Sequence, residues 1–167
     1  MKPQVAILMG SDSDFEIMKE SGDALDEFKI PYEFQVLSAH RSPQSVSEFA
    51  SQAHGKGFKV LIAGAGGAAH LAGVVAAHTI LPVIGVPIPS TPLNGFDSLL
   101  STVQMPAGIP VATVSVGKAG ARNAGILAAQ MIALSEAVLS KALVDFKKRL
   151  AEGVREKNAR IQKQPAQ

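Results

Sequence analysis

The hydrophobic residues of this chain fall into short, nearly continuous runs, separated by segments in which apolar residues recur at helical spacing. The runs are rich in valine and isoleucine, which is typical of strands. In one run Tyr32, Phe34 and Val36 alternate with Glu33 and Gln35, which predicts a strand near the edge of a sheet. The predicted strands cover residues 5–9, 32–36, 60–63, 83–86 and 111–115.

The segments between these runs predict helices. Ser13 and Glu16 have the spacing of a capping box, so a helix is expected to begin near Asp14. Ser42 followed by Pro43 predicts a second helix start, because proline suits the first helical position. The predicted helices cover 14–28, 43–55, 69–78, 119–139 and 144–162, with one or two helical turns over 97–103 and a frayed tail over 163–167.

This alternation of strands and helices predicts an α/β fold with an open parallel sheet covered on both faces, in a single domain over 1–162. The stretch 60–117 supports buried strands, because Asp97 is its only charged residue. The prolines and glycines within this stretch argue against a membrane-spanning helix. The N-terminal residues show no signal-peptide pattern, so we expect no membrane partner.

Charge is distributed unevenly along the chain. The 16 basic and 14 acidic residues give a net charge of +2, but residues 141–167 hold eight basic and three acidic residues. This segment is therefore +5, and residues 1–140 are −3. We interpret it as a solvated helix face and not as a nucleic-acid site, because acidic residues are mixed in and Phe146 is the only aromatic residue. The absence of cysteine excludes a disulfide scaffold and fits a reducing, cytoplasmic location.

Polar residues follow the first two predicted strands, where open α/β sheets bind ligands. Ser11 and Ser13 lie at a helix start, which favours an anion, whereas Asp14 suits sugar hydroxyls. Arg41 supplies a cation that matches phosphate, and His40 beside it exchanges a proton near neutral pH. Purely structural interpretations remain: Ser13 as an N-cap, Arg41 in a surface ion pair and His40 as a structural histidine.

A glycine-rich loop follows the third strand. It fits the dinucleotide-binding pattern through Gly64, Gly66 and Ala69, but no acidic residue between 60 and 96 is present to bind a ribose. We therefore interpret the glycines as a surface on which a flat ring lies close to the backbone. The four histidines lack cysteine partners and the H-E-x-x-H spacing, so no metal site is expected.

Together these loops resemble one family, the bacterial class I N5-carboxyaminoimidazole ribonucleotide mutases of purine biosynthesis (PurE family). The resemblance rests on Met-Gly-Ser-Asp-Ser-Asp at 9–14, Ser-Ala-His-Arg at 38–41 and Gly-Ala-Gly-Gly-Ala-Ala-His-Leu at 64–71. Later motifs, among them Asp-Ser-Leu-Leu at 97–100, extend it over about residues 5–135. Phe15 and Ala72 depart from the family pattern, in which Trp and Pro are usual.

The resemblance implies a flavodoxin-like three-layer α/β/α sandwich, assembled as a homo-octamer, and we expect the helix over 144–162 to pack on a neighbouring subunit. It implies an isomerase without cofactor that moves a carboxylate from the exocyclic nitrogen of an aminoimidazole ribonucleotide to ring carbon C4. The reaction would proceed by decarboxylation and recapture of CO2, with His40 as proton carrier. The substrate-binding residues that the resemblance implies are Ser11, Ser13, Asp14, Ser38, Arg41, Ala65, Gly66, Gly67, His70 and Leu71.

Three other functions remain open from the sequence. One is a carboxylase of the same family that uses CO2 directly, although its third loop usually differs from the one seen here. The second is a flavin- or nicotinamide-dependent oxidoreductase on the same fold, since a fold does not determine a function. The third is a flavodoxin-like nucleotide-binding module without enzymatic activity.

Overall fold

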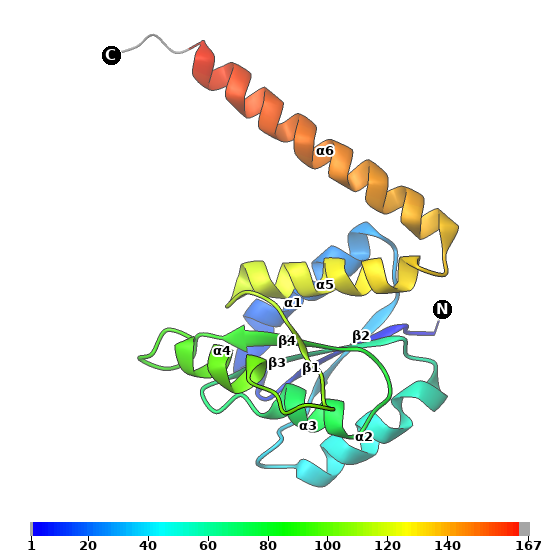
Figure 1. The fold of residues 1–167 in the computed structure, drawn as a ribbon, viewed down its shortest axis with the longest axis vertical. Helices are drawn as coiled ribbons and strands as arrows, with labels where there is room; N and C mark the ends of the chain where they lie inside the picture. Colours follow the sequence, from blue (N-terminus) through cyan, green and yellow to red (C-terminus); the bar gives the residue numbers. More distant parts are fainter. Residues whose placement is uncertain (1, 164–167) are drawn as a thin grey trace.

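The centre of the molecule is a five-stranded sheet in which every pair of neighbouring strands is parallel (Figure 1). This computed structural model describes residues 2–163. The strand order is β2-β1-β3-β4-β5, so the order of the strands reverses between β1 and β3. The strands are β1 (Val5–Met9), β2 (Tyr32–Val36), β3 (Val60–Gly66), β4 (Val83–Ile88) and β5 (Ala112–Thr113).

Helices cover both faces of the sheet, which confirms the three-layer α/β/α fold. Helices α1 and α5 lie on one face, and α2 and α3 lie on the other (Figure 1). Ile7 and Ile62 point into the first layer, whereas Leu8 and Leu61 point into the second, as alternation along a strand requires. The helices within residues 2–163 are η1 (Asp12–Asp14), α1 (Phe15–Glu27), α2 (Pro43–Lys56), α3 (Leu71–Ala77), α4 (Phe96–Val103), α5 (Lys118–Ala133) and α6 (Ala137–Gln162).

Helices α1 and α5 approach each other closely because the residues between them are small. Ser21 on α1 is fully buried, and its hydroxyl donates a hydrogen bond of 2.7 Å to the carbonyl oxygen of Ala121 on α5. A Cβ atom built on Gly125 would overlap the carbonyl oxygen of Ser21 and lie 2.8 Å from the Cβ of Ala24. The spacing of these two helices therefore depends on a glycine at position 125.

Two strands, β3 and β5, differ in length from the predicted ones. β3 continues beyond residue 63 to Gly66, because Gly64, Ala65 and Gly66 all pair with β4. β5 is limited to Ala112–Thr113, where the hydrophobic pattern predicts 111–115, because this edge strand pairs only with two residues of β4. The other strands, and helices α1 to α4, agree with the predicted ranges to within two residues.

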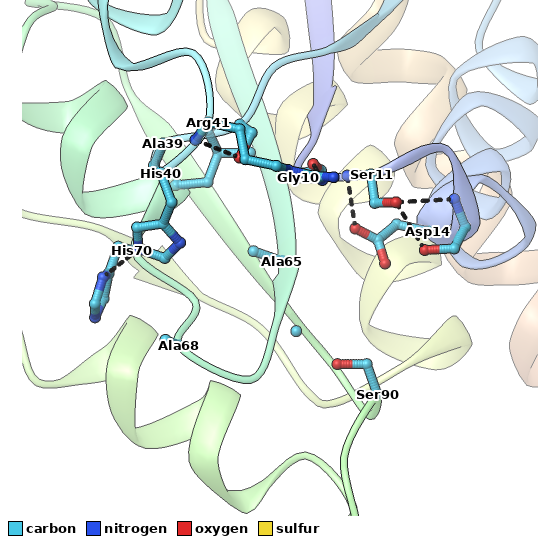
Figure 2. A pocket seen from close by; sticks show the side chains of 14 residues that line it. Gly10, Ser11, Asp14, Ala39, His40, Arg41, Ala65, Ala68, His70 and Ser90 are labelled. Atoms are coloured by element: carbon cyan, nitrogen blue, oxygen red, sulfur yellow. Dashed lines mark hydrogen bonds between the residues drawn. The ribbon is translucent and has the colours of Figure 1, made fainter.

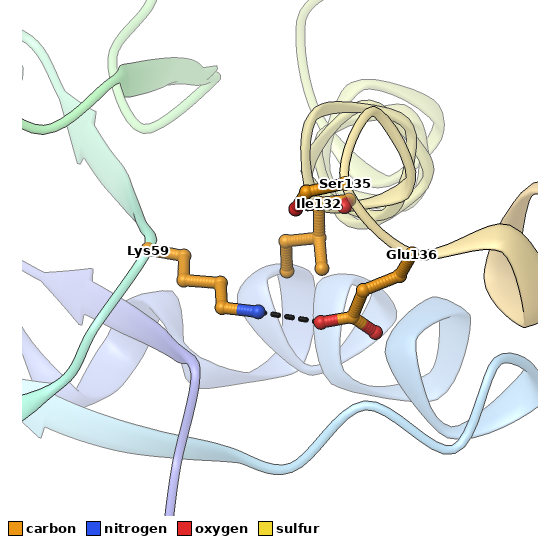
Figure 3. Close-up of polar contacts among 4 residues, drawn as sticks. All are labelled: Lys59, Ile132, Ser135 and Glu136. Carbon is orange, nitrogen blue, oxygen red and sulfur yellow. Dashed lines mark hydrogen bonds and ion pairs between the residues drawn. The ribbon is translucent and has the colours of Figure 1, made fainter.

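The long helix predicted over 119–139 is interrupted, and this prediction was wrong. Helix α5 ends at Ala133, and α6 begins at Ala137, seven residues before the predicted start at 144. Glu136 has an extended backbone (φ −129°, ψ 97°), and its carboxylate forms an ion pair with Lys59 (Figure 3). The Ser135 hydroxyl donates to the carbonyl oxygen of Ile132 at 3.3 Å, which satisfies a carbonyl at the end of α5.

Helix α6 projects away from the domain (Figure 1). Only Leu139 and Phe146 of this helix are buried, and the Phe146 ring packs edge-to-face on Phe28 at 5.4 Å between ring centroids. The frayed tail predicted over 163–167 lies mostly outside the described residues. No helix within residues 2–163 is both long enough and apolar enough to cross a membrane.

Replacing Gly125 by Ala tests the contact between α1 and α5. The added methyl group would force the Ser21 backbone away, so we expect the free energy of unfolding to fall by about 1–3 kcal/mol in urea denaturation. Gly55→Ala in α2 is the matched control, because a Cβ atom there meets nothing within 4 Å. That change should leave stability unchanged or raise it by up to about 1 kcal/mol. Equal effects of the two substitutions would contradict the close contact.

Candidate active site

A cavity of about 340 Å³ opens at the carboxyl ends of β1, β2 and β3, where the strand order reverses (Figure 2). Ten of the eleven residues predicted for the site line this cavity, and Gly67 does not. Four further lining residues, Gly10, Ala39, Ala68 and Ser90, were missed by sequence reasoning. Ser90 follows β4, so the rule that drew attention to the first three loops applies to it as well.

The first loop is built around a capping box, although not the predicted one. Ser11 is the N-cap residue, and its hydroxyl accepts a hydrogen bond from the backbone N–H of Ser13. The carboxylate of Asp14 accepts a hydrogen bond from the backbone N–H of Ser11 at 3.2 Å. The prediction of a capping box at Ser13 and Glu16 was therefore wrong by two residues, because η1 places the cap before α1 begins.

Asp14 is a buried carboxyl group, with only 7% of its surface exposed, at the bottom of this first loop. Its pKa is raised above the usual value of 3.8, first because burial removes the carboxylate from water and then because Asp12 lies near it. The hydrogen bond from Ser11 and the positive charge of Arg41 act in the opposite direction. Asp14 faces the cavity, so its carboxylate is available as a hydrogen-bond acceptor for a polar ligand.

The second loop places a cation across from the first. One guanidinium nitrogen of Arg41 (Nη2) donates to the carbonyl oxygen of Gly10 at 2.9 Å, and its Nε lies 3.4 Å from the Ser38 hydroxyl (Figure 2). Ser38 also accepts a hydrogen bond of 3.1 Å from the backbone N–H of Arg41. None of the ion pairs within residues 2–163 involves Arg41, so its charge is available to an anionic ligand.

Two histidines meet on the other side of the cavity. The Nε2 atom of His40 lies 2.7 Å from the Nδ1 atom of His70, and the two rings are nearly perpendicular (Figure 2). A hydrogen bond between two imidazole nitrogens requires that one of them carries a proton and the other does not. One proton therefore lies between the two facing nitrogens, and both rings are exposed and line the cavity.

The floor of the cavity is formed by the end of β3 and has no polar side chains. Ala65 and Ala68 lie there (Figure 2), and Gly66 also lines this part of the cavity. Such a surface leaves room for a flat group close to the backbone, and the binding of a flat ring there stays a prediction. No cluster of three or more His, Cys, Asp or Glu residues that could hold a metal ion is found in the described part of the chain.

The fold and the cavity define an α/β protein with an arginine, a buried carboxylate and a histidine pair at the point where the strand order reverses. The sequence matches the family described as AIR carboxylase over residues 4–153. The chain therefore belongs to the AIR carboxylase family, which confirms the resemblance to the PurE enzymes.

Two mutases and one solved PurE structure illustrate this similarity. The N5-carboxyaminoimidazole ribonucleotide mutase of Bacillus subtilis is 54% identical over 161 residues, which cover 96% of this chain and 99% of the relative. The mutase of Pyrococcus horikoshii is 50% identical, covering 96% and 90%. The crystal structure of Treponema denticola PurE superimposes with a TM-score of 0.87 at 27% identity, covering 96% of this chain and 99% of that one.

Replacing Asp14 by Asn tests the burial of its carboxyl group. Because the pKa is raised on folding, the unfolded chain loses this proton at a lower pH than the folded protein does. The stability of the parent relative to Asp14→Asn should therefore fall as the pH rises from below 3.8 to the folded pKa, and then level off. Urea unfolding at a series of pH values measures this difference.

Asp145→Asn is the control with the opposite sign. The hydrogen bond from Lys141 lowers the pKa of Asp145, so the parent should gain stability over this variant as the pH rises toward 3.8. The same trend for both variants would contradict the burial of Asp14.

Proposed function

We propose that this protein is an N5-carboxyaminoimidazole ribonucleotide mutase, an isomerase of purine biosynthesis, and that His40 carries the proton during the reaction. The activity follows from the family and from curated mutases that match 96% of this chain at 54% identity. The contact between His40 and His70 in a cavity that also holds an anion site is the observation that carries the mechanism.

The reaction needs one proton, which leaves the enzyme and returns to it. When the bond between the exocyclic nitrogen and the carboxylate carbon breaks, the electron pair stays on the nitrogen, and this nitrogen takes a proton from His40. CO2 is released within the cavity. Ring carbon C4 then attacks CO2 with a ring electron pair, and the C4 proton passes back to His40. One histidine therefore acts as general acid in the first half and as general base in the second.

The arrangement of the cavity supports one orientation of the substrate. Arg41, together with the hydroxyl groups of Ser11, Ser13 and Ser38, binds the 5′-phosphate, because guanidinium and hydroxyl groups match phosphate oxygens. Asp14 accepts hydrogen bonds from the ribose. The imidazole and its carboxylate then lie over the backbone that runs from Ala65 through Gly66 and Gly67 to His70 and Leu71. The small apolar surface there keeps water away from CO2.

A second candidate is direct carboxylation by CO2, because the family is described as AIR carboxylase. The curated relatives at 50–54% identity are mutases, which favours the mutase reaction. Proton NMR of the C4 position, with either the N5-carboxylated substrate or bicarbonate as carboxyl donor, separates the two activities.

We also place the enzyme in the cytoplasm, on the basis of its role in purine biosynthesis.

We further propose that the protein forms a homo-octamer in which α6 packs on a neighbouring subunit. One stripe of apolar residues runs along α6 and faces the protein's own core at Leu139 and Phe146. The same stripe continues past the domain through Leu150, Val154 and Ile161, which are 51–66% exposed. A stripe that is half covered indicates a further partner for the uncovered half. The charges of +5 on 141–167 and −3 on the rest favour a second copy of the chain as that partner.

Replacing His40 by Asn tests the proton carrier. The variant retains a polar side chain of similar shape but cannot exchange the proton, so kcat should fall by roughly 10²- to 10⁴-fold. Proton NMR at C4 follows the interconversion of the two carboxylated ribonucleotides, and calorimetry verifies that substrate still binds. His78→Asn is the control, because His78 contacts Ser47 outside the cavity. Conversion at the parent rate by His40→Asn would show that another group carries the proton.

Replacing Val154 by Glu tests the packing of α6. A charge in the uncovered part of the stripe should disrupt the assembly, which light scattering detects as a lower molecular mass. Ala159→Glu introduces the same charge on the opposite, exposed face of α6 and should leave the mass unchanged. If Val154→Glu has the same mass as the parent, or if the parent is a monomer, α6 does not pack on a neighbouring subunit.

A further inference from the structure

Ser90 occupies a place in the cavity for which neither the family resemblance nor the mechanism provides a role. It lies two residues beyond the end of β4, and β4 pairs with β3 so that Ile88 is opposite Gly66. Ser90 is exposed and lines the cavity, with its hydroxyl directed toward the end of β3 (Figure 2). It is the polar side chain that the fourth strand contributes to this site.

The Ser90 hydroxyl lies over Gly66 at close range. A Cβ atom built on Gly66 would overlap the Ser90 Oγ atom and lie 2.7 Å from the Ser90 Cβ atom. Glycine at 66 therefore leaves the space that the hydroxyl occupies. A ligand group that lies on the backbone of β3 has this hydroxyl beside it.

This hydroxyl makes no hydrogen bond within residues 2–163, unlike the other serine hydroxyls of the cavity. Ser11 donates to Asp12, Ser13 donates to Ser11, and Ser38 accepts from Arg41 (Figure 2). Ser90 therefore has both its donor and its acceptor capacity free for a ligand.

The segment that carries Ser90 is held in place from both sides. The buried Ser98 hydroxyl is placed to donate to the carbonyl oxygens of Ile88 and Gly95, both at 3.0 Å. The Thr91 hydroxyl donates to the carboxylate of Asp97 at 2.7 Å, and this hydrogen bond lowers the pKa of Asp97. Ser90 is thus presented by a fixed segment, so its hydroxyl needs little rearrangement to bind a ligand.

We propose that Ser90 contacts the substrate: its hydroxyl donates a hydrogen bond to the carboxylate that lies over Gly66, and it thereby favours carboxylated over uncarboxylated ribonucleotide. This inference rests on the proposed function, which uses the other polar side chains for the phosphate, the ribose and the proton. A neutral donor suits this position, because the carboxylate becomes uncharged CO2 midway through the reaction. A cation at the same place would stabilise the carboxylate and oppose its loss.

Replacing Ser90 by Ala removes the hydroxyl and keeps the backbone and the Cβ atom. Calorimetry would measure the dissociation constants of the 4-carboxylated product and of the uncarboxylated aminoimidazole ribonucleotide. We expect the dissociation constant of the carboxylated product to rise about tenfold, which corresponds to the loss of one hydrogen bond to a carboxylate. The dissociation constant of the uncarboxylated ribonucleotide should change less than about twofold. Ser101→Ala is the matched control, because that hydroxyl donates to the backbone of Asp97 in the neighbouring helix α4 and does not line the cavity.

Unchanged affinity of Ser90→Ala for the carboxylated ribonucleotide would overturn the inference. Equal weakening for both ribonucleotides would also overturn it, because that result indicates a purely structural role for Ser90. A parent protein that binds neither ribonucleotide would contradict the proposed function, and this inference with it. In the first two cases the parent still binds and converts its substrate, so the two failures are distinguishable.

Discussion

The C-terminal end of β3 has almost no side-chain volume, and the elements around it are placed accordingly. A Cβ atom on Gly64 would overlap the Met18 sulfur, so α1 approaches the sheet only because this position has no side chain. Two residues on, Gly66 leaves the space for Ser90 from the next strand. Gly66 also forms the floor of the cavity, together with Ala65. Packing on one face and ligand access at the edge thus depend on one short segment, which is why larger residues there would disturb both.

The loops at the carboxyl ends of the strands bring together residues that are far apart in the sequence. Arg41 bonds to the backbone of Gly10, and His40 meets His70, so three separate loops become one site. These contacts form because parallel strands all deliver their carboxyl ends to the same edge of the sheet. The loops themselves contribute little buried surface, and the buried strands β1 and β3 hold them in position. The site is therefore a consequence of the strand order.

The sheet, its layers and most of the site follow from the sequence, because buried strands and strand-end loops leave strong local patterns. The failures have physical causes. The interruption between α5 and α6 coincides with an ion pair between Lys59 and Glu136, which are 77 positions apart and give no local signal. The apolar spacing continues through 134–139, so the pattern alone predicts a single helix. The position of the cap at Ser11 depends on η1, whose three residues are too few to produce a periodic pattern.

Two features of the chain cost stability, and each is accounted for by the complexes proposed above. Asp14 is a buried carboxyl group whose pKa is raised by burial despite the hydrogen bond from Ser11, and further hydrogen bonds from the proposed ligand would favour its ionised form. The outer half of α6 exposes an apolar stripe that a single copy of the chain leaves uncovered. Such features persist where binding stabilises the folded state, because anything that binds only the folded form shifts the equilibrium toward it. In the proposed complex, the stability of this fold would therefore depend in part on the bound ligand and on the neighbouring subunits.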